Sequence, residues 1–186
     1  MQEAELSMAR RFGDSEESIL QVQTNLAITY GQLGRDEEAL SMKRDVYSGS
    51  LKFYGAQHRR SFIPANNYAA GLVSLKRFKQ AKALLRKTMP VVRRVLGEGC
   101  DATLIMRLNY AKALYEDPAA TDDDLREAVT TLEEIEATAR RVLGGSYPTT
   151  VSIERSLRNA RAALRAREAP EVLQTADDLA AHFDSL

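Results

Sequence analysis

Side-chain amides recur at a fixed spacing along this chain of 186 residues. Asn25, Asn67 and Asn109 stand 42 residues apart, and each directly precedes a Leu-Ala or Tyr-Ala pair. A primary amide both donates and accepts hydrogen bonds, so a row of asparagines could bind the backbone of an extended peptide whatever its sequence. The alternative is that these amides bond to adjacent helices and only stabilise their stacking. The two roles can coexist.

Residue types that catalyse reactions or bind metals are sparse. Cys100 is the single cysteine, so an internal disulfide or a cysteine-based zinc site is impossible. His58 and His182 are the only histidines, and each is expected at a surface turn or tail. The run Asp122-Asp123-Asp124 lacks the glycine and the distal glutamate of a calcium loop, and a helix start explains it better. With no phosphate-binding glycine loop and no nucleophile elbow, we predict no enzymatic activity, no cofactor and no metal site.

Composition limits the partners and the compartment. The 26 basic and 26 acidic residues cancel, which argues against nucleic acid or a membrane surface as the partner of the whole chain. No apolar run is long enough to cross a bilayer, and the acids among the first six residues do not fit a signal peptide. These features, with the single cysteine, predict a cytoplasmic protein.

Charge is nevertheless distributed unevenly. Residues 46–97 contain no acid, whereas nine acids and only Arg126 lie between Glu116 and Glu136. A field of one sign over a repeat can steer a partner of opposite charge. The alternative, which we prefer, is a solvated outer face on which the charges of neighbouring repeats offset one another.

Several other residues keep the spacing of the asparagines. Gly13, Gly55 and Gly97 also stand 42 residues apart, and the later step widens to 47 between Gly97 and Gly144. The wider step places a five-residue insertion between Asn109 and Ala128. A fixed period in this range is typical of stacked supersecondary units.

Each period reads as two amphipathic helices. Ser15 (or Asp14) and Ser61 are expected as helix caps, Thr121 and Asp124 as a capping box, and glycines as the carboxyl-terminal stops. Pro90 predicts a kink or a break near Met89. The resulting array covers 1–168, with a half repeat over 1–13, repeats over 14–55, 56–97 and 98–144, and a terminal helix over 148–167; a short closing helix or a tail follows over 169–186.

The repeats resemble the tetratricopeptide (TPR) pattern, in Leu26-Ala27 and Tyr30, in Tyr68-Ala69 and Leu72, and in Tyr110-Ala111 and Leu114. The 42-residue period, the preceding asparagine and the closing Tyr-Gly or Leu-Gly pair resemble the longer repeat of kinesin light chains. The resemblance implies an all-α fold, a right-handed superhelical solenoid of antiparallel helix pairs whose first helices line a concave groove that holds peptides.

The same resemblance supplies the candidate site. Its groove-facing positions include Asn25, Asn66, Asn67, Asn109, Lys112, Arg155 and Asn159. Lys112 and Arg155 would recognise a carboxylate through charge-assisted hydrogen bonds. The expected partner is thus a protein or peptide that is acidic or carries a free carboxylate.

We therefore predict a protein-interaction scaffold that binds a peptide or protein segment in its groove. The alternative is a self-assembling or structural element, in which a second copy meets the open helix of residues 1–12. The chain is expected to be a monomer or a weak homodimer, and a monomer would exclude the alternative.

Overall fold

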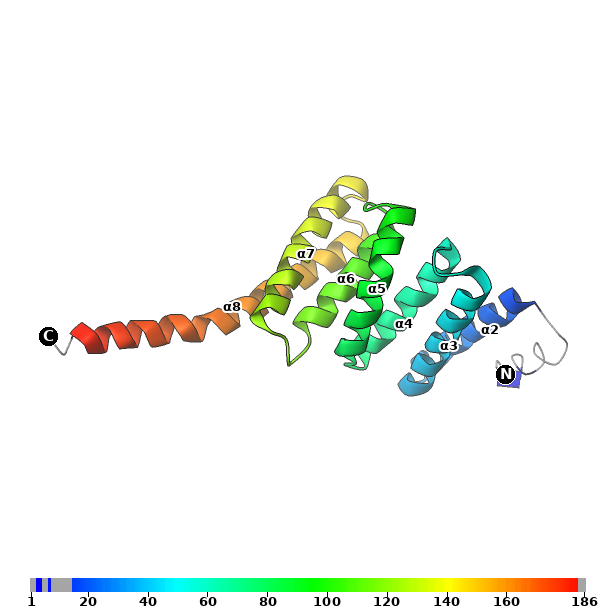
Figure 1. Cartoon of the computed structure of the whole chain (residues 1–186), viewed down its shortest axis with the longest axis horizontal. Helices are drawn as coiled ribbons and strands as arrows, with labels where there is room; N and C mark the ends of the chain where they lie inside the picture. Colours follow the sequence, from blue (N-terminus) through cyan, green and yellow to red (C-terminus); the bar gives the residue numbers. More distant parts are fainter. Residues whose placement is uncertain (1–2, 5–6, 8–14, 184–186) are drawn as a thin grey trace.

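The computed structural model describes residues 3–4, 7 and 15–183, with the surroundings of side chains described as far as residue 168. All regular elements in this part of the chain are helical (Figure 1). They are α2 (Glu16–Gln32), α3 (Asp36–Tyr54), the 3-10 turn η1 (Arg59–Ser61), α4 (Phe62–Ser74), α5 (Phe78–Leu96), α6 (Asp101–Tyr115), α7 (Asp122–Val142) and α8 (Pro148–Phe183).

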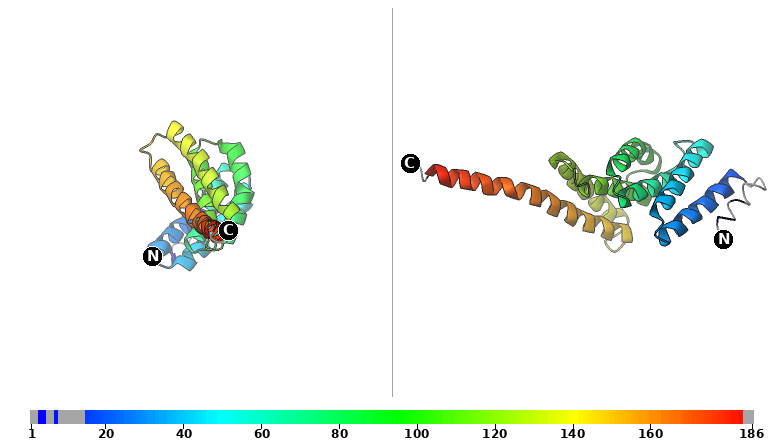
Figure 2. Two further views of the ribbon diagram at one scale, coloured as in Figure 1. Left: turned by 90° about the vertical axis from the view of Figure 1, so that its left-hand side faces the viewer. Right: turned by 90° about the horizontal axis from the view of Figure 1, so that it is seen from below.

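Consecutive helices form antiparallel hairpins that lie side by side along the molecule (Figures 1 and 2). Each helix packs against the next one in the chain, and α6 also packs against α4 and α8. This arrangement confirms the predicted fold class, an all-α solenoid of antiparallel helix pairs. None of the described helices is long and apolar enough to span a membrane.

The helix boundaries follow local chemistry. The Ser15 hydroxyl accepts a hydrogen bond from the Ser18 amide at 3.2 Å, and Thr121 forms the expected capping box with Asp124. The glycines that end or follow helices have positive φ, which a residue without Cβ adopts at little cost; they are Gly34 (71°), Gly55 (88°), Gly97 (84°) and Gly144 (90°). The short-range signals in the sequence therefore define most of the repeat boundaries.

One local prediction was wrong, and of the kink or break predicted near Met89 the break is excluded. Ser61 does not cap α4 with its side chain, because its buried hydroxyl instead donates to the Gly55 carbonyl at 2.8 Å. Pro90 does not break α5, which continues from Phe78 to Leu96. Leu85 and Val92, on either side of the proline, are both fully buried, and their packing offsets the lost backbone hydrogen bond.

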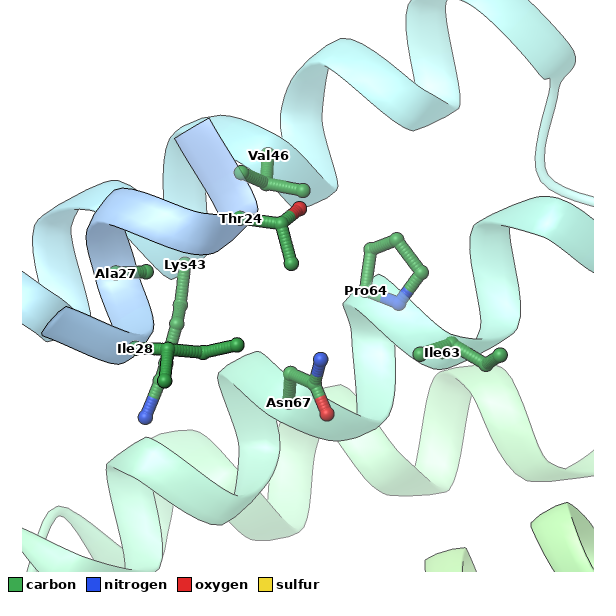
Figure 3. Close-up of a pocket in the computed structure, with 8 residues that line it drawn as sticks. All are labelled: Thr24, Ala27, Ile28, Lys43, Val46, Ile63, Pro64 and Asn67. Carbon is green, nitrogen blue, oxygen red and sulfur yellow. The ribbon is translucent and has the colours of Figure 1, made fainter. Parts of the chain in front are cut away.

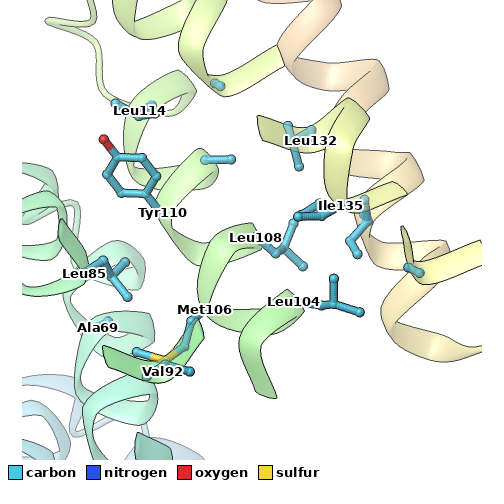
Figure 4. Close-up of a cluster of buried hydrophobic side chains, with 14 of the residues drawn as sticks. Ala69, Leu85, Val92, Leu104, Met106, Leu108, Tyr110, Leu114, Leu132 and Ile135 are labelled. Atoms are coloured by element: carbon cyan, nitrogen blue, oxygen red, sulfur yellow. The ribbon is translucent and has the colours of Figure 1, made fainter. Parts of the chain in front are cut away.

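The core is densest around α6, where side chains of α4, α5, α7 and α8 meet (Figure 4). Leu104, Met106 and Leu114 of α6 are fully buried, as are Leu132 and Ile135 of α7. A helix such as α6, with apolar side chains on every face, is stable only when neighbouring helices cover all of its faces. The middle of the array is therefore its most enclosed part.

The ends of the array differ from the prediction in one respect. Helix α8 is continuous from Pro148 to Phe183, whereas the sequence suggested a terminal helix over 148–167 and a separate closing element. No glycine follows Gly145, and the segment is rich in the strong helix formers Ala, Arg, Glu and Leu. The half repeat expected over 1–13 lies largely outside the described residues, although Glu3 accepts a hydrogen bond from the Tyr30 hydroxyl at 2.6 Å.

Candidate functional site

The first helices of the repeats do not stack evenly. Helix α4 packs directly on α6, and α6 packs directly on α8. Among the described residues, no such backbone contact joins α2 to α4, because α2 reaches the rest of the array through α3. A cleft therefore opens between α2 and α4, with α3 as its floor (Figure 3).

The walls of this cleft are mainly aliphatic. Ile28 of α2 and Ile63 of α4 are 54% and 63% exposed, which is unusual for residues of this type. A hollow of about 60 Å³ lies in the cleft. Its lining residues are Thr24, Ala27, Ile28, Lys43, Val46, Ile63, Pro64 and Asn67.

The cleft continues beyond this hollow. A second hollow shares Thr24, Val46, Ile63 and Pro64 with the first and extends along α2 toward its amino end. At that far end Arg60 forms an ion pair with Glu17, beside the Tyr54 ring. Together the two hollows form one channel that an extended chain could follow.

Lys43 was not among the residues predicted to bind a partner, although its position in the repeat could have indicated it. In the repeat register it occupies the position of Leu85 and Leu132, which are both fully buried. The Lys43 stem lies over Gly71, where a Cβ atom would come within 3.3 Å of the Lys43 Cδ atom. Lys43 therefore fits at a position that is buried in the other repeats for two reasons. Gly71 leaves room for its stem, and the separation of the α2 and α4 backbones leaves its charged end uncovered.

The Lys43 ammonium group emerges beside Ile28 at the edge of the hollow (Figure 3). Three of the four acids of α3 pair with other residues: Glu37 with Arg77, Glu38 with Arg35 and Asp45 with Arg44. No described carboxylate lies within ion-pair distance of Lys43. The cleft therefore combines an aliphatic hollow with a positive charge that the described residues leave unpaired.

The predicted asparagines do not act alike. The Asn109 amide donates to the Asn66 side-chain oxygen at 2.9 Å and thereby joins α6 to α4. Asn109 is only 9% exposed, so the stacking role is the one that its contacts support. Asn25 is exposed and accepts a bond only from Gln21 of its own helix among the described residues. Asn67 lines the hollow between α2 and α4.

The remaining predicted positions lie toward the other end of the array. Lys112 is half-buried on α6, and Arg155 and Asn159 are exposed on α8. None of these three residues lines the cleft described above. Their role in recognising a carboxylate stays a prediction.

The uneven charge of the sequence is partly offset within the fold. Basic residues of one repeat form ion pairs with acids of a neighbouring repeat, as the second interpretation of the charge distribution predicted. The pairs include Arg60 with Glu17, Arg77 with Glu37, Lys82 with Asp117 and Asp124, Arg86 with Glu127, and Arg140 with Glu154. These contacts favour a structural role for the charged residues that form these pairs.

The five-residue insertion also has a structural contact. It brings Asp117 to 3.3 Å from the Lys82 ammonium group, and Asp124 lies 3.6 Å from the same group. All three side chains are less than 20% exposed. Burial by itself raises the pKa of Asp124, but the Thr121 amide and the Lys82 charge outweigh it and hold the pKa below its ordinary value.

A second polar network connects α5, α6 and α7. Arg86 donates to the Tyr110 hydroxyl at 2.7 Å, and that hydroxyl donates to Glu127 at 2.7 Å. Burial, together with the bond to Glu127, raises the pKa of Tyr110 to about 12. The residues that the structure describes contain no cluster of three or more histidine, cysteine or acidic groups arranged to hold a metal ion.

No protein-family model and no curated protein matches this sequence. Solved structures do match. A crystal structure of a variant form of a candidate kinesin light chain with nearly identical TPR-like repeats, from Podosopora anserina, has a TM-score of 0.73 and 21% identity. The match covers 100% of this chain and 86% of the other. A second structure of that protein has a TM-score of 0.71 and 21% identity, and the match covers 98% and 85% of the two chains.

A third match is BtubC (BKLC) from P. vanneervenii, with a TM-score of 0.62 and 15% identity. It covers 87% of this chain and 66% of the other. All three similarities extend over most of the helical array, and at these identities they establish the fold. The chain is therefore a repeat protein with the all-α, TPR-like fold of these structures.

Proposed function

We propose that this chain is a protein-interaction scaffold that holds an extended segment of a partner protein against its first helices. The observation that carries the proposal is the cleft between α2 and α4, in which Ile28 and Ile63 expose aliphatic surface. Scattered apolar residues are common on protein surfaces, but apolar residues that converge on a hollow are typical of binding sites. The TPR-like fold supports the same function.

The contacts of the described residues also support a passive role in chemistry. The titratable groups with shifted pKa values, such as Tyr110 and Asp124, take part in ion pairs or hydrogen bonds between helices. Of the described groups with shifted pKa values, Arg60 alone lines the cleft, at its far end, where it pairs with Glu17. A catalytic site would instead place such groups together in a concave pocket.

The proposal is tested by selecting peptides from a random library on the immobilised full chain and measuring their affinity by fluorescence anisotropy. Ile63→Asp should weaken binding at least tenfold, because it places a charge in the aliphatic hollow. Val95→Asp is the matched control, since Val95 is an exposed aliphatic residue of α5 outside the cleft. If no peptide is selected, or if both variants bind as the unmodified chain does, the proposal is wrong.

The double change Asn67→Ala and Asn109→Ala separates the roles of the amides. Loss of affinity with unchanged thermal stability would assign them to the ligand. Loss of stability with unchanged affinity would assign them to stacking, which the bond between Asn109 and Asn66 favours. Self-assembly, the alternative function, depended on residues 1–12 and is tested by sedimentation at several concentrations.

A further inference from the structure

The cleft between α2 and α4 has a size that limits what it can accept. The adjoining channel has a volume of about 360 Å³. The inner hollow of about 60 Å³ is far below the roughly 300–1,000 Å³ of small-molecule sites. It is also smaller than the cavity of about 150 Å³ that accepts a benzene ring in a protein core. The forked end of a valine, leucine or isoleucine side chain fits this space better than an aromatic ring does.

The side chains at the edge of the hollow include a positively charged group and a polar one. Lys43 replaces the buried leucine of the other repeats, so its ammonium group is held next to aliphatic walls. Asn67 supplies an amide on the opposite side, from α4 (Figure 3). An ammonium group and an amide donor beside an apolar hollow are complementary to a carboxylate that follows an aliphatic residue.

The shape of the cleft suits an extended segment of a partner. The hollow opens into the channel that runs past Ile63 and Pro64 toward Glu17 and Arg60. A peptide whose side chain fills the hollow can therefore continue along this channel. Because successive residues of an extended chain advance by about 3.3 Å, a carboxylate one or two positions from the aliphatic residue stays near the edge of the hollow.

We propose that the cleft between α2 and α4 binds an extended segment of a partner protein that carries a branched aliphatic residue one or two positions from an aspartate or glutamate. The aliphatic side chain enters the hollow, and the carboxylate binds the Lys43 ammonium group. This inference rests on the proposed scaffold function and adds to it the chemistry of the partner. It also assigns carboxylate recognition to Lys43 on α3, the second helix of its repeat, instead of to Lys112 and Arg155.

The test is a selection from a random peptide library in which every peptide is blocked at its carboxyl end, on the full chain and three variants. The unmodified chain should enrich pairs of an aliphatic residue and an acid about tenfold over aromatic-acid pairs. Lys43→Gln should retain the aliphatic preference and lose the preference for an acid. Lys52→Gln is the matched control, because Lys52 is an exposed lysine of α3 that lines neither hollow, and it should change neither preference.

Lys43→Leu is the most specific variant. It restores the leucine of the other repeats, so it should fill the hollow, raise the melting temperature and abolish the aliphatic preference together with the acidic one. A rise in melting temperature shows that the variant folds, which makes its loss of binding interpretable.

Three outcomes would overturn the inference while leaving the scaffold function intact. In the first, the selected peptides keep their preference for an acid in Lys43→Gln. In the second, the selected peptides are rich in aromatic residues. In the third, peptides are enriched only from a second library whose carboxyl ends are free. A library that yields no binder at all would instead contradict the scaffold function itself.

Discussion

Lys76 adopts a left-handed backbone conformation, and the equivalent residue of the preceding repeat is a glycine, Gly34. It has φ of 57°, the one positive φ outside glycine among the described residues, and it stands 42 residues after Gly34. For a residue with Cβ the left-handed region costs about 1 kcal/mol or more. The turn between α4 and α5 therefore contains strain that the turn between α2 and α3 avoids.

We expect Lys76→Gly to raise the free energy of unfolding by about 1 kcal/mol, because it removes this strain. Gly34→Ala should lower it by a similar amount, since a Cβ atom at Gly34 would meet no neighbouring atom and only the backbone conformation is penalised. Urea titration followed by circular dichroism measures both changes. A destabilising effect of Lys76→Gly would contradict this interpretation.

Tyr110 links pH to stability. Its pKa of about 12 in the folded chain exceeds the value near 10 expected in the unfolded chain. The unfolded chain thus loses this proton first, and the contribution of Tyr110 is complete below about pH 10 and is lost as the pH rises toward 12. Stability measured from pH 9 to pH 12 should fall less steeply in Tyr110→Phe. Equal slopes would show that this phenol is not perturbed.

At the scale of the elements, the inserted loop before α7 is attached to the preceding repeat. Lys82 of α5 lies between Asp117 of the loop and Asp124 at the start of α7. Removing the cation would leave two largely buried carboxylates without compensation, which is costly even where the intact ion pair adds little.

Lys82→Met should therefore lower the free energy of unfolding by about 2 to 3 kcal/mol at pH 7. The loss should shrink as the pH falls below about 4, where the carboxylates become protonated. Lys79→Met on the same helix is exposed and should change stability by less than about 0.5 kcal/mol. A loss in Lys82→Met that does not depend on pH would indicate lost packing rather than lost charge.

At the scale of the whole molecule, the array is more firmly packed in its middle than at its first repeat. Helix α6 packs against α4, α5, α7 and α8, whereas α2 packs only against α3 among the described helices. In repeat proteins, stability is approximately a sum over units and their interfaces, so a repeat with fewer interfaces opens more easily.

Hydrogen exchange followed by mass spectrometry should find the slowest exchange in α6 and the fastest, among helices α2 to α7, in α2. Leu114→Ala should accelerate exchange in most of the array, because Leu114 is fully buried in the central core. Leu26→Ala should accelerate it chiefly in α2 and α3, since Leu26 belongs to a separate small cluster there. Uniform exchange across the helices would contradict this order.

The sequence by itself determined the helices and their repetition. The 42-residue spacing of Asn25, Asn67 and Asn109, the glycine stops and the capping box at Thr121 are local or periodic signals, because each depends on a few neighbouring residues or on one repeated face. They sufficed to predict the all-α solenoid of antiparallel hairpins.

Only the tertiary structure decided how evenly these hairpins stack and which groups meet between them. The cleft exists because the backbones of α2 and α4 are not in contact. The roles of Lys43 and Asn109 depend on residues 28 and 43 positions away, Gly71 and Asn66. Spacing along the chain specifies the face on which a side chain lies. Whether that face meets a neighbour, another side chain or an open hollow depends on packing in three dimensions.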